Sequence, residues 1–199
     1  MSVYIKYIEP SKSRDLVSET MILMGSSVSE FCYQNDISIP YRCQDSRPVE
    51  FNQTDNITLN NYIIKQSFNY NYLSPNPKPH FGLGLNCYAQ LTSPIRRYND
   101  MLIHYQIYAF FQGRKSFTES EILYIANKTL AGVKEINEYT RFNKYCWMYE
   151  FFKHNNERSW SVYYLRTIKL VDSLYLVHFI DLSMELIIKI QRIIKPSFG

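Results

Sequence analysis

The first part of the chain joins a segment with strand periodicity to a longer one with helix periodicity. Residues 3–8 alternate apolar and polar side chains as a strand does, and Pro10 ends that pattern. Residues 12–34 repeat apolar side chains at helical spacing, which predicts a helix. Its apolar face is formed by Val17, Met21, Met24, Val28 and Phe31. Residues 35–60 are polar and interrupted by prolines, so we expect turns or irregular structure there.

The middle of the chain is punctuated by prolines and glycines. A short helix is predicted over residues 61–71. The proline-rich residues 74–79 cannot continue it, because proline lacks a backbone N–H and fixes φ. Residues 87–91 have the pattern of a short strand that enters a turn.

The segment after this strand predicts a helix with two arginines at its amino end. Ser93 is a favourable N-cap and Pro94 suits the first helical position, and the helical spacing continues to Gly113. Arg96 and Arg97 would then lie in the first turn, where the helix dipole disfavours cations. Free backbone N–H groups beside a guanidinium suit a bound phosphate or carboxylate.

A structural alternative exists for the same arginines. They can pair with acidic side chains such as Asp100, one helical turn beyond Arg96. The residue chemistry by itself favours neither interpretation.

The last part of the chain changes from helical to strand periodicity. Thr118 and Glu121 form a capping box at the start of a helix predicted over residues 118–152. Three strands are predicted beyond it, over residues 160–169, 174–180 and 184–193. We therefore expect an α+β fold, with helices packed on a sheet in a first domain and a partial β-module after it. The expected domains are residues 1–156 and 157–199.

Composition narrows the classes of protein without identifying a ligand. The chain of 199 residues is 46% hydrophobic and 16% aromatic, which is enough to build a core. The net charge of +4 is compatible with nucleic acid but too small to indicate it. The cysteines are scattered without metal-ligand spacing, and neither a secretory signal nor a membrane-spanning segment is present. We expect a soluble intracellular protein, and the abundance of Asn, Ile, Tyr and Lys suggests an AT-rich genome such as that of a plastid.

Four motifs occur in an order that resembles a known family. They are Ser13-Arg14-x-Leu16-Val17-x-Glu19-x-Met21-Ile22-Leu23, Ile39-Pro40-Tyr41-Arg42, Pro79-His80-Phe81-Gly82-Leu83-Gly84-Leu85 and Tyr88-Ala89-x-x-Thr92-Ser93-Pro94-Ile95-Arg96-Arg97-Tyr98-x-Asp100. Together they resemble the RNB-domain exoribonucleases, the family of ribonuclease II and ribonuclease R. The resemblance covers the C-terminal half of the nuclease domain. More weakly, residues 160–193 resemble the start of the S1 RNA-binding module.

The resemblance implies a 3′→5′ exoribonuclease that acts on single-stranded RNA and uses a divalent metal, usually Mg²⁺, held by a cluster of aspartates. It implies that Arg96 contacts the phosphate near the scissile bond, as a catalytic residue. Arg97 is a candidate for substrate binding, or a structural partner of an acid. Tyr88 is a candidate for stacking on a base, or for packing, and Glu19 is a possible orienting residue on its helix.

The aspartates depart from the family pattern, because none of them forms a cluster. They are Asp15, Asp36, Asp45, Asp55, Asp100, Asp172 and Asp181. The sequence therefore predicts no metal ligands in this chain. We expect an exoribonuclease component whose aspartate half comes from another chain. The alternatives are a non-catalytic RNA-binding protein and a degenerate remnant of such a nuclease.

Two histidines have simpler structural interpretations. His80 lies among prolines and glycines, where a local hydrogen bond accounts for it better than general-base catalysis. His104 on the predicted motif helix has no second ligand at metal spacing, so we expect a hydrogen-bonded histidine in the core or at its rim.

Overall fold

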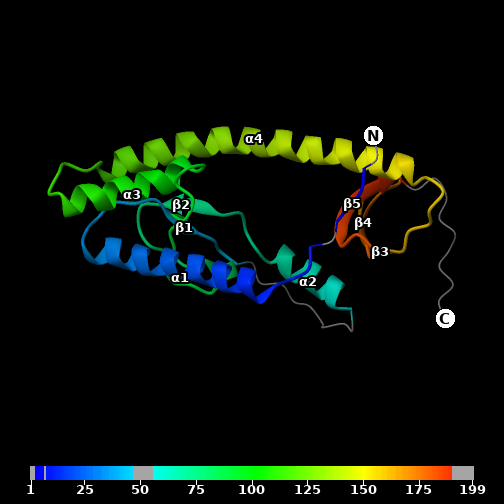
Figure 1. Cartoon of the computed structure of the whole chain (residues 1–199), viewed down its shortest axis with the longest axis horizontal. Coiled ribbons are helices and arrows are strands. Elements are labelled where there is room, and N and C mark those ends of the chain that lie inside the picture. The colour runs from blue at the N-terminus through cyan, green and yellow to red at the C-terminus, as the bar shows by residue number, and fades with distance from the viewer. Residues whose placement is uncertain (1–2, 7, 47–55, 190–199) are drawn as a thin grey trace. The chain divides into compact units, whose positions relative to one another are not determined.

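A computed structural model of the chain describes residues 3–6, 8–46 and 56–189 and confirms the α+β class (Figure 1). The described helices and strands are α1 (Lys12–Gln34), β1 (Tyr41–Cys43), α2 (Ile57–Gln66), β2 (Tyr72–Ser74), the 3-10 turn η1 (Phe81–Leu83), α3 (Tyr98–Phe111), α4 (Glu119–His154), β3 (Val162–Lys169), β4 (Leu174–Phe179) and β5 (Met184–Lys189).

The two long helices occur where the periodicity predicts them. In α1, the Ser11 hydroxyl accepts a hydrogen bond from the backbone N–H of Arg14, and this cap sets the first turn. At the start of α4, the backbone N–H of Thr118 donates to the Glu121 carboxylate at 2.8 Å. The capping box is therefore confirmed. These helices begin where a polar side chain can satisfy a backbone group that the helix itself leaves unpaired.

Two predictions about the first half of the chain are wrong, and a third is confirmed with shifted bounds. Residues 3–6 form no strand, and Tyr7 lies outside the described residues. The helix predicted over 61–71 is α2, which begins four residues earlier at Ile57. The segment expected to be irregular contains β1, which pairs antiparallel with β2 from the edge of the proline-rich segment. This pairing needs a partner about thirty residues away, and local periodicity carries no information on it.

The chain divides into two compact units, which we call the α-rich unit and the β-rich unit. The α-rich unit comprises residues 9–53 and 63–142, and the β-rich unit comprises residues 1–8, 54–62 and 143–199. Helix α4 contributes residues to both units.

The core of the α-rich unit lies between α1 and the β1–β2 ribbon. Tyr41 and Cys43 of β1 are buried against Cys32 of α1 and Ile103 of α3. Figure 1 draws the ribbon between α1 and the first half of α4. Since successive strand side chains point to opposite faces, Arg42 points away from this core. The short strand thus presents a basic side chain on the face opposite α1.

The predicted apolar face of α1 is confirmed only in the second half of the helix, where Val28 and Phe31 pack against the core. The buried residues are Gly25, Ser29 and Cys32, whereas Val17 and Met21 are 53% and 43% exposed. A Cβ added at Gly25 would lie 2.3 Å from the Tyr88 ring. The small residues let the chain before α3 approach the helix closely, and hydrophobic periodicity does not detect such a contact.

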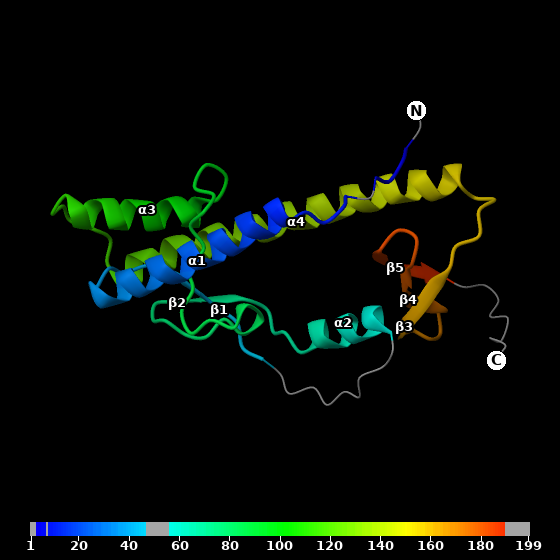
Figure 2. The ribbon, with the colours of Figure 1, turned by 60° about the horizontal axis from the view of Figure 1, so that its bottom comes forward.

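Helix α3 and the first half of α4 lie side by side (Figures 1 and 2). The Asn99 side-chain amide of α3 donates to the backbone carbonyl of Ala126 in α4 at 3.4 Å. Ile122 and Ala126 are buried in this contact region, and Leu102 and Ala109 are buried on α3.

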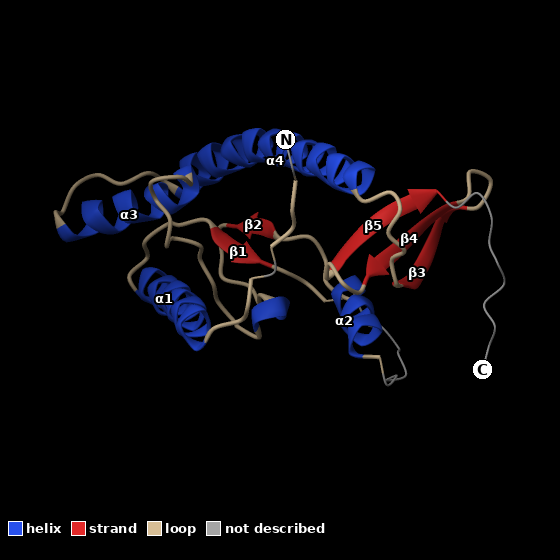
Figure 3. Ribbon diagram, turned by 45° about the vertical axis from the view of Figure 1, so that its right-hand side comes forward, coloured by secondary structure: helices blue, strands red, loops and turns tan. Residues whose placement is uncertain are grey.

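The β-rich unit contains an antiparallel sheet in the order β3-β4-β5 (Figure 3). Alternate residues of β4, namely Tyr175, Val177 and Phe179, form its core with Phe152 and Trp160 packed against them. The three predicted strands are confirmed, although residues 190–193 lie outside the described residues. The relation of this sheet to an S1 module remains a prediction.

Candidate nucleic-acid interface

The two motif arginines precede α3 instead of lying in its first turn. Residues 94–96 form a turn, and α3 begins at Tyr98. The Ser93 carbonyl accepts hydrogen bonds from the backbone N–H groups of Arg96 at 3.3 Å and Arg97 at 3.0 Å. Arg97 then adopts an extended conformation with φ −128° and ψ 111°, which breaks any helix begun at Ser93. The predicted Ser93 cap and the helix start at Pro94 are therefore wrong.

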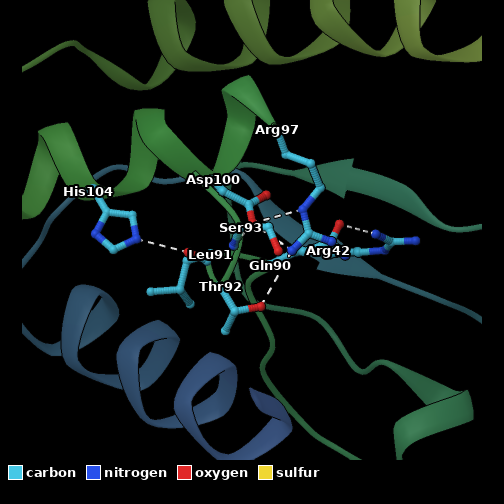
Figure 4. A network of polar contacts seen from close by, with 8 residues as sticks. All are labelled: Arg42, Gln90, Leu91, Thr92, Ser93, Arg97, Asp100 and His104. Atoms are coloured by element: carbon cyan, nitrogen blue, oxygen red, sulfur yellow. Dashed lines mark hydrogen bonds and ion pairs between the residues drawn. The ribbon is translucent and has the colours of Figure 1, made fainter. Parts of the chain in front are cut away.

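Asp100 fixes this turn from inside the protein (Figure 4). Its side chain is 1% exposed, and its Oδ2 atom accepts a hydrogen bond from the Ser93 backbone N–H at 2.8 Å. The same oxygen accepts from Arg97 Nε at 2.9 Å and lies 2.8 Å from Arg97 Nη2. Arg97 also donates to the Thr92 hydroxyl at 3.4 Å. Thus a buried carboxylate holds both Ser93 and Arg97.

Arg96 points to solvent from the turn that Asp100 fixes. Its side chain is exposed, as is the preceding Ile95, and it makes no hydrogen bond or ion pair with any described residue. Its backbone N–H is bonded to Ser93, so the turn is anchored although the guanidinium is free to meet a ligand. This arrangement presents one cation on a fixed backbone.

The other two candidates have different surroundings. The Tyr88 ring packs on Gly25 and meets the His80 ring edge-on, with ring centres 5.4 Å apart. Burial raises the pKa of Tyr88, and the charges of Arg42 and Arg97 oppose that rise. The hydroxyl therefore lies in the field of both arginines. Glu19 is exposed on α1 and has no partner among the described residues.

Arg42 belongs to this region and was not recognised as a site residue from the sequence. Its Nη1 donates to the Gln90 side-chain oxygen, and its backbone N–H donates to the Tyr88 carbonyl at 2.9 Å. Burial lowers the pKa of Arg42; the positive charge of Arg97 lowers it further, while Tyr88 and Asp100 oppose that change. The sequence contained one signal, since Arg42 ends one of the four family motifs, Ile39-Pro40-Tyr41-Arg42.

The segment 87–91 connects these groups but is not a strand in the structure. The Tyr88 carbonyl pairs with β1, while the next N–H, of Ala89, donates to the Gly25 carbonyl of α1 at 3.3 Å. Because the second bond goes to a helix, no strand ladder continues. The segment is extended and carries Tyr88 and Gln90 toward the arginines.

A cavity of about 380 Å³ lies beside the side chains of Arg42 and Arg97 within the α-rich unit. Its walls include Arg42, Gln90, Arg97 and Asp100, and the first half of α4 contributes Leu130 and Val133. The cavity is in the size range of small-molecule sites, and its combination of apolar wall and polar groups is typical of them.

The histidines take part in local structure. The His104 Nε2 atom lies 2.8 Å from the Leu91 carbonyl, and the residue is exposed, so His104 is a hydrogen-bonded histidine at the rim and not in the core. His80 is 7% exposed, and its backbone N–H donates to the Leu85 carbonyl at 2.7 Å. Its ring Nδ1 is buried without a hydrogen-bond partner in the described residues. Burial lowers the pKa of His80, which favours the neutral ring.

The described residues do not fit a magnesium site. No group of three or more His, Cys, Asp or Glu side chains converges among them. Asp100, the carboxylate of the motif, is already committed to Arg97 and to the Ser93 N–H. Mg²⁺ requires several oxygen ligands, so no metal-dependent step can be assigned to these residues.

A family model for the RNB domain matches residues 2–113, which includes α1, β1 and the turn that carries Arg96. The chain belongs to the RNB-domain family. The resemblance drawn from the four motifs is thus confirmed, and the RNB match ends just after α3.

Curated relatives extend the similarity along the RNB-domain chain. It is 30% identical to an uncharacterized ribonuclease of Synechocystis sp., over 99% of this chain and 30% of that protein. It is 32% identical to Ribonuclease II, chloroplastic/mitochondrial, of Arabidopsis thaliana, over 77% of this chain and 20% of that protein. The chain therefore spans less than a third of the length of these two relatives.

Solved structures share the fold of this RNB-domain chain. A Dss1 exoribonuclease from Candida glabrata aligns with a TM-score of 0.74 and 20% identity over 94% of this chain and 26% of the other. Mycoplasma genitalium RNase R in complex with ribose methylated single-stranded RNA aligns with a TM-score of 0.68 and 20% identity, over 96% of this chain and 36% of the other. Among the described residues, no helix is long and apolar enough to cross a membrane.

Proposed function

We propose that this chain is the phosphate-binding part of a 3′→5′ exoribonuclease that acts on single-stranded RNA. Membership of the RNB-domain family and the ribonuclease names of its relatives support the reaction class. A similar fold is known with single-stranded RNA bound, in Mycoplasma genitalium RNase R.

Arg96 is the observation that carries this proposal. The guanidinium is exposed, unpaired among the described residues and mounted on a turn whose backbone is bonded to Ser93. A guanidinium can donate two parallel hydrogen bonds to a phosphate and stabilise the charge that builds up during phosphoryl transfer. In this proposal Arg97 holds the turn, through Asp100, and Arg96 contacts the phosphate.

Hydrolysis needs groups beyond those described here. In the proposed enzyme, the carboxylates that hold Mg²⁺ come from outside the described residues, either from the rest of a longer chain or from a second chain. The exposed apolar side chains of α1 support such a neighbour, since Leu16 and Leu23 are 69% and 66% exposed. Exposed apolar surface of this kind often marks an interaction site.

Degradation of a 5′-labelled single-stranded RNA tests the proposal, with Mg²⁺ and with EDTA, beside a filter-binding titration. We expect salt-sensitive RNA binding by the isolated chain, because phosphate contacts release counterions. Arg96→Ala should weaken binding, whereas Arg114→Ala removes the same charge from an exposed arginine at the other end of α3 and should weaken it less. Equal effects of the two variants would contradict a specific role for Arg96.

The same experiment separates the second candidate function, a non-catalytic RNA-binding protein. The lack of a metal-ligand group among the described residues favours it for the isolated chain. Binding with no shortening of the RNA, in Mg²⁺ or EDTA, identifies this alternative. Stepwise shortening from the 3′ end that EDTA stops identifies the nuclease, and no affinity for RNA rejects both.

A plastid location is also proposed. The residue composition corresponds to AT-rich codons, and one relative carries a chloroplastic/mitochondrial name. Cell fractionation followed by an antibody against this chain tests the location.

A further inference from the structure

The cavity beside Arg42 holds more positive than negative charge. Arg42 and Arg97 both line it, and Asp100 is the carboxylate among its described lining residues. Asp100 bonds to Arg97, whereas Arg42 bonds to the neutral amide of Gln90. One guanidinium charge therefore lacks an anionic partner in the described part of this cavity.

Burial makes this imbalance costly. Arg42 is partly buried, and burial lowers its pKa; the nearby Arg97 charge lowers it further, while Tyr88 and Asp100 oppose that change. An anion that enters the cavity would offset the desolvation of Arg42 and the repulsion between the two guanidiniums. Figure 4 shows the Arg42 and Arg97 side chains reaching the same region, from β1 and from the residue before α3.

The remaining polar groups of the cavity suit an anion with many acceptor oxygens. Asn71, Asn99 and Asn137 bring amide groups from three separate segments to its wall. The Asn99 amide nitrogen already donates to the Ala126 carbonyl at 3.4 Å, so the amide N–H groups left for a ligand are those of Asn71 and Asn137. A phosphate group offers more acceptors than a carboxylate, and guanidinium and amide N–H groups both donate to it.

We propose that this cavity is a phosphate-binding site in which Arg42 and Arg97 hold the anion. The site differs from the exposed Arg96 position and does not require that the protein cleaves RNA. The phosphate can belong to a free nucleotide or to the backbone of a nucleic acid, and the two sources share this chemistry.

Isothermal titration calorimetry of the full chain at fixed ionic strength tests the site. The probes are inorganic phosphate, adenosine monophosphate and a short single-stranded oligoribonucleotide, with adenosine as the phosphate-free control. Saturable binding of the first two identifies a site for free phosphate esters. Binding of the oligoribonucleotide alone identifies a backbone site. Both outcomes support the proposal, and binding of adenosine as tight as that of its monophosphate overturns it.

Gln90→Glu is the decisive variant, with Gln112→Glu as its matched control. A glutamate at 90 places a carboxylate where Arg42 already donates, which neutralises the cavity. Gln112 is exposed at the end of α3, so its substitution makes the same charge change away from the cavity. We expect Gln90→Glu to raise the Kd at least about tenfold, or about 1.4 kcal/mol, and the control to raise it less than about twofold.

Circular dichroism should verify the fold of each variant. If Gln90→Glu does not fold, Arg42→Gln replaces it, because that change removes the unpaired charge directly. No binding of any probe by the wild-type chain overturns the proposal. So does equal binding by the folded cavity variant and the Gln112→Glu control.

Discussion

Replacement of Asp100 should destabilise the α-rich unit more than replacement of any exposed acid. The carboxylate is 1% exposed, and one oxygen accepts from Ser93 N–H and from two nitrogen atoms of Arg97. Asp100→Asn keeps an oxygen for the Ser93 N–H but loses the charge that pairs with Arg97. Asp100→Ala also leaves the buried Ser93 N–H without an acceptor.

The magnitude follows from what each variant leaves unpaired. Hydrogen bonds to charged groups contribute about 1.5–3 kcal/mol each, and loss of one partner of a buried ion pair costs about 3–5 kcal/mol. The Arg97 side chain is 26% exposed, so water can partly replace the lost carboxylate. We therefore expect a loss of about 1.5–3 kcal/mol in the free energy of unfolding for Asp100→Asn and about 3–5 kcal/mol for Asp100→Ala.

Urea unfolding at pH 7, followed by circular dichroism, measures these differences. Asp172→Asn is the control, because Asp172 pairs with Lys169 at the surface, where the side chains are 44% and 64% exposed. Such a pair contributes less than about 1 kcal/mol. Equal losses for Asp100→Asn and Asp172→Asn would refute the conclusion that Asp100 anchors the turn. If the slope of the unfolding free energy against urea concentration differs between variants, they expose different amounts of surface on unfolding, and their free energies cannot be compared directly.

Three further predictions concern packing and titration. Gly25→Ala should lower the free energy of unfolding by about 1–3 kcal/mol or more, since the new Cβ would lie 2.3 Å from the Tyr88 ring. In Gly132→Ala the new Cβ meets nothing within 4 Å, so this variant should gain about 0.5–1 kcal/mol of helix stability. Thermal unfolding of both variants measures the difference. At neutral pH a thiol reagent should modify the exposed Cys146 rapidly and Cys32 slowly, by mass spectrometry; rapid labelling of both would contradict the buried thiol. Burial raises the pKa of Cys32 to about 12, so the stability it contributes is complete below its unfolded pKa and is lost as pH rises from about 9 toward 12. Urea unfolding at a series of alkaline pH values should show that the free energy of unfolding falls less steeply with pH in Cys32→Ala than in the wild-type chain. An equal dependence on pH in the two proteins would reject the Cys32 thiol as the cause.

Local signals in the sequence determined the long helices and the terminal strands. The Thr118–Glu121 capping box and the helical spacing after it are interactions within one or two turns, so they can be read without knowing the fold. The alternation in β4 was likewise visible, because its buried residues repeat every second position. The motif around Arg96 indicated the family, because a motif is a run of residue types that can be recognised without the fold.

Contacts between distant segments decided the rest. Arg42 and Gln90 are 48 positions apart, and only the fold brings their side chains together. Helix α1 buries Gly25 more deeply than its larger apolar residues because the segment at Tyr88 lies directly against this glycine. Helix α3 begins at Tyr98 and not at Pro94, where the sequence predicted its start. The reason is that Asp100 bonds the Ser93 N–H and the Arg97 side chain, and the Arg97 backbone is extended. A strong local cap signal was therefore overruled by a buried charge, because a buried carboxylate without its partners costs more than the loss of a single cap.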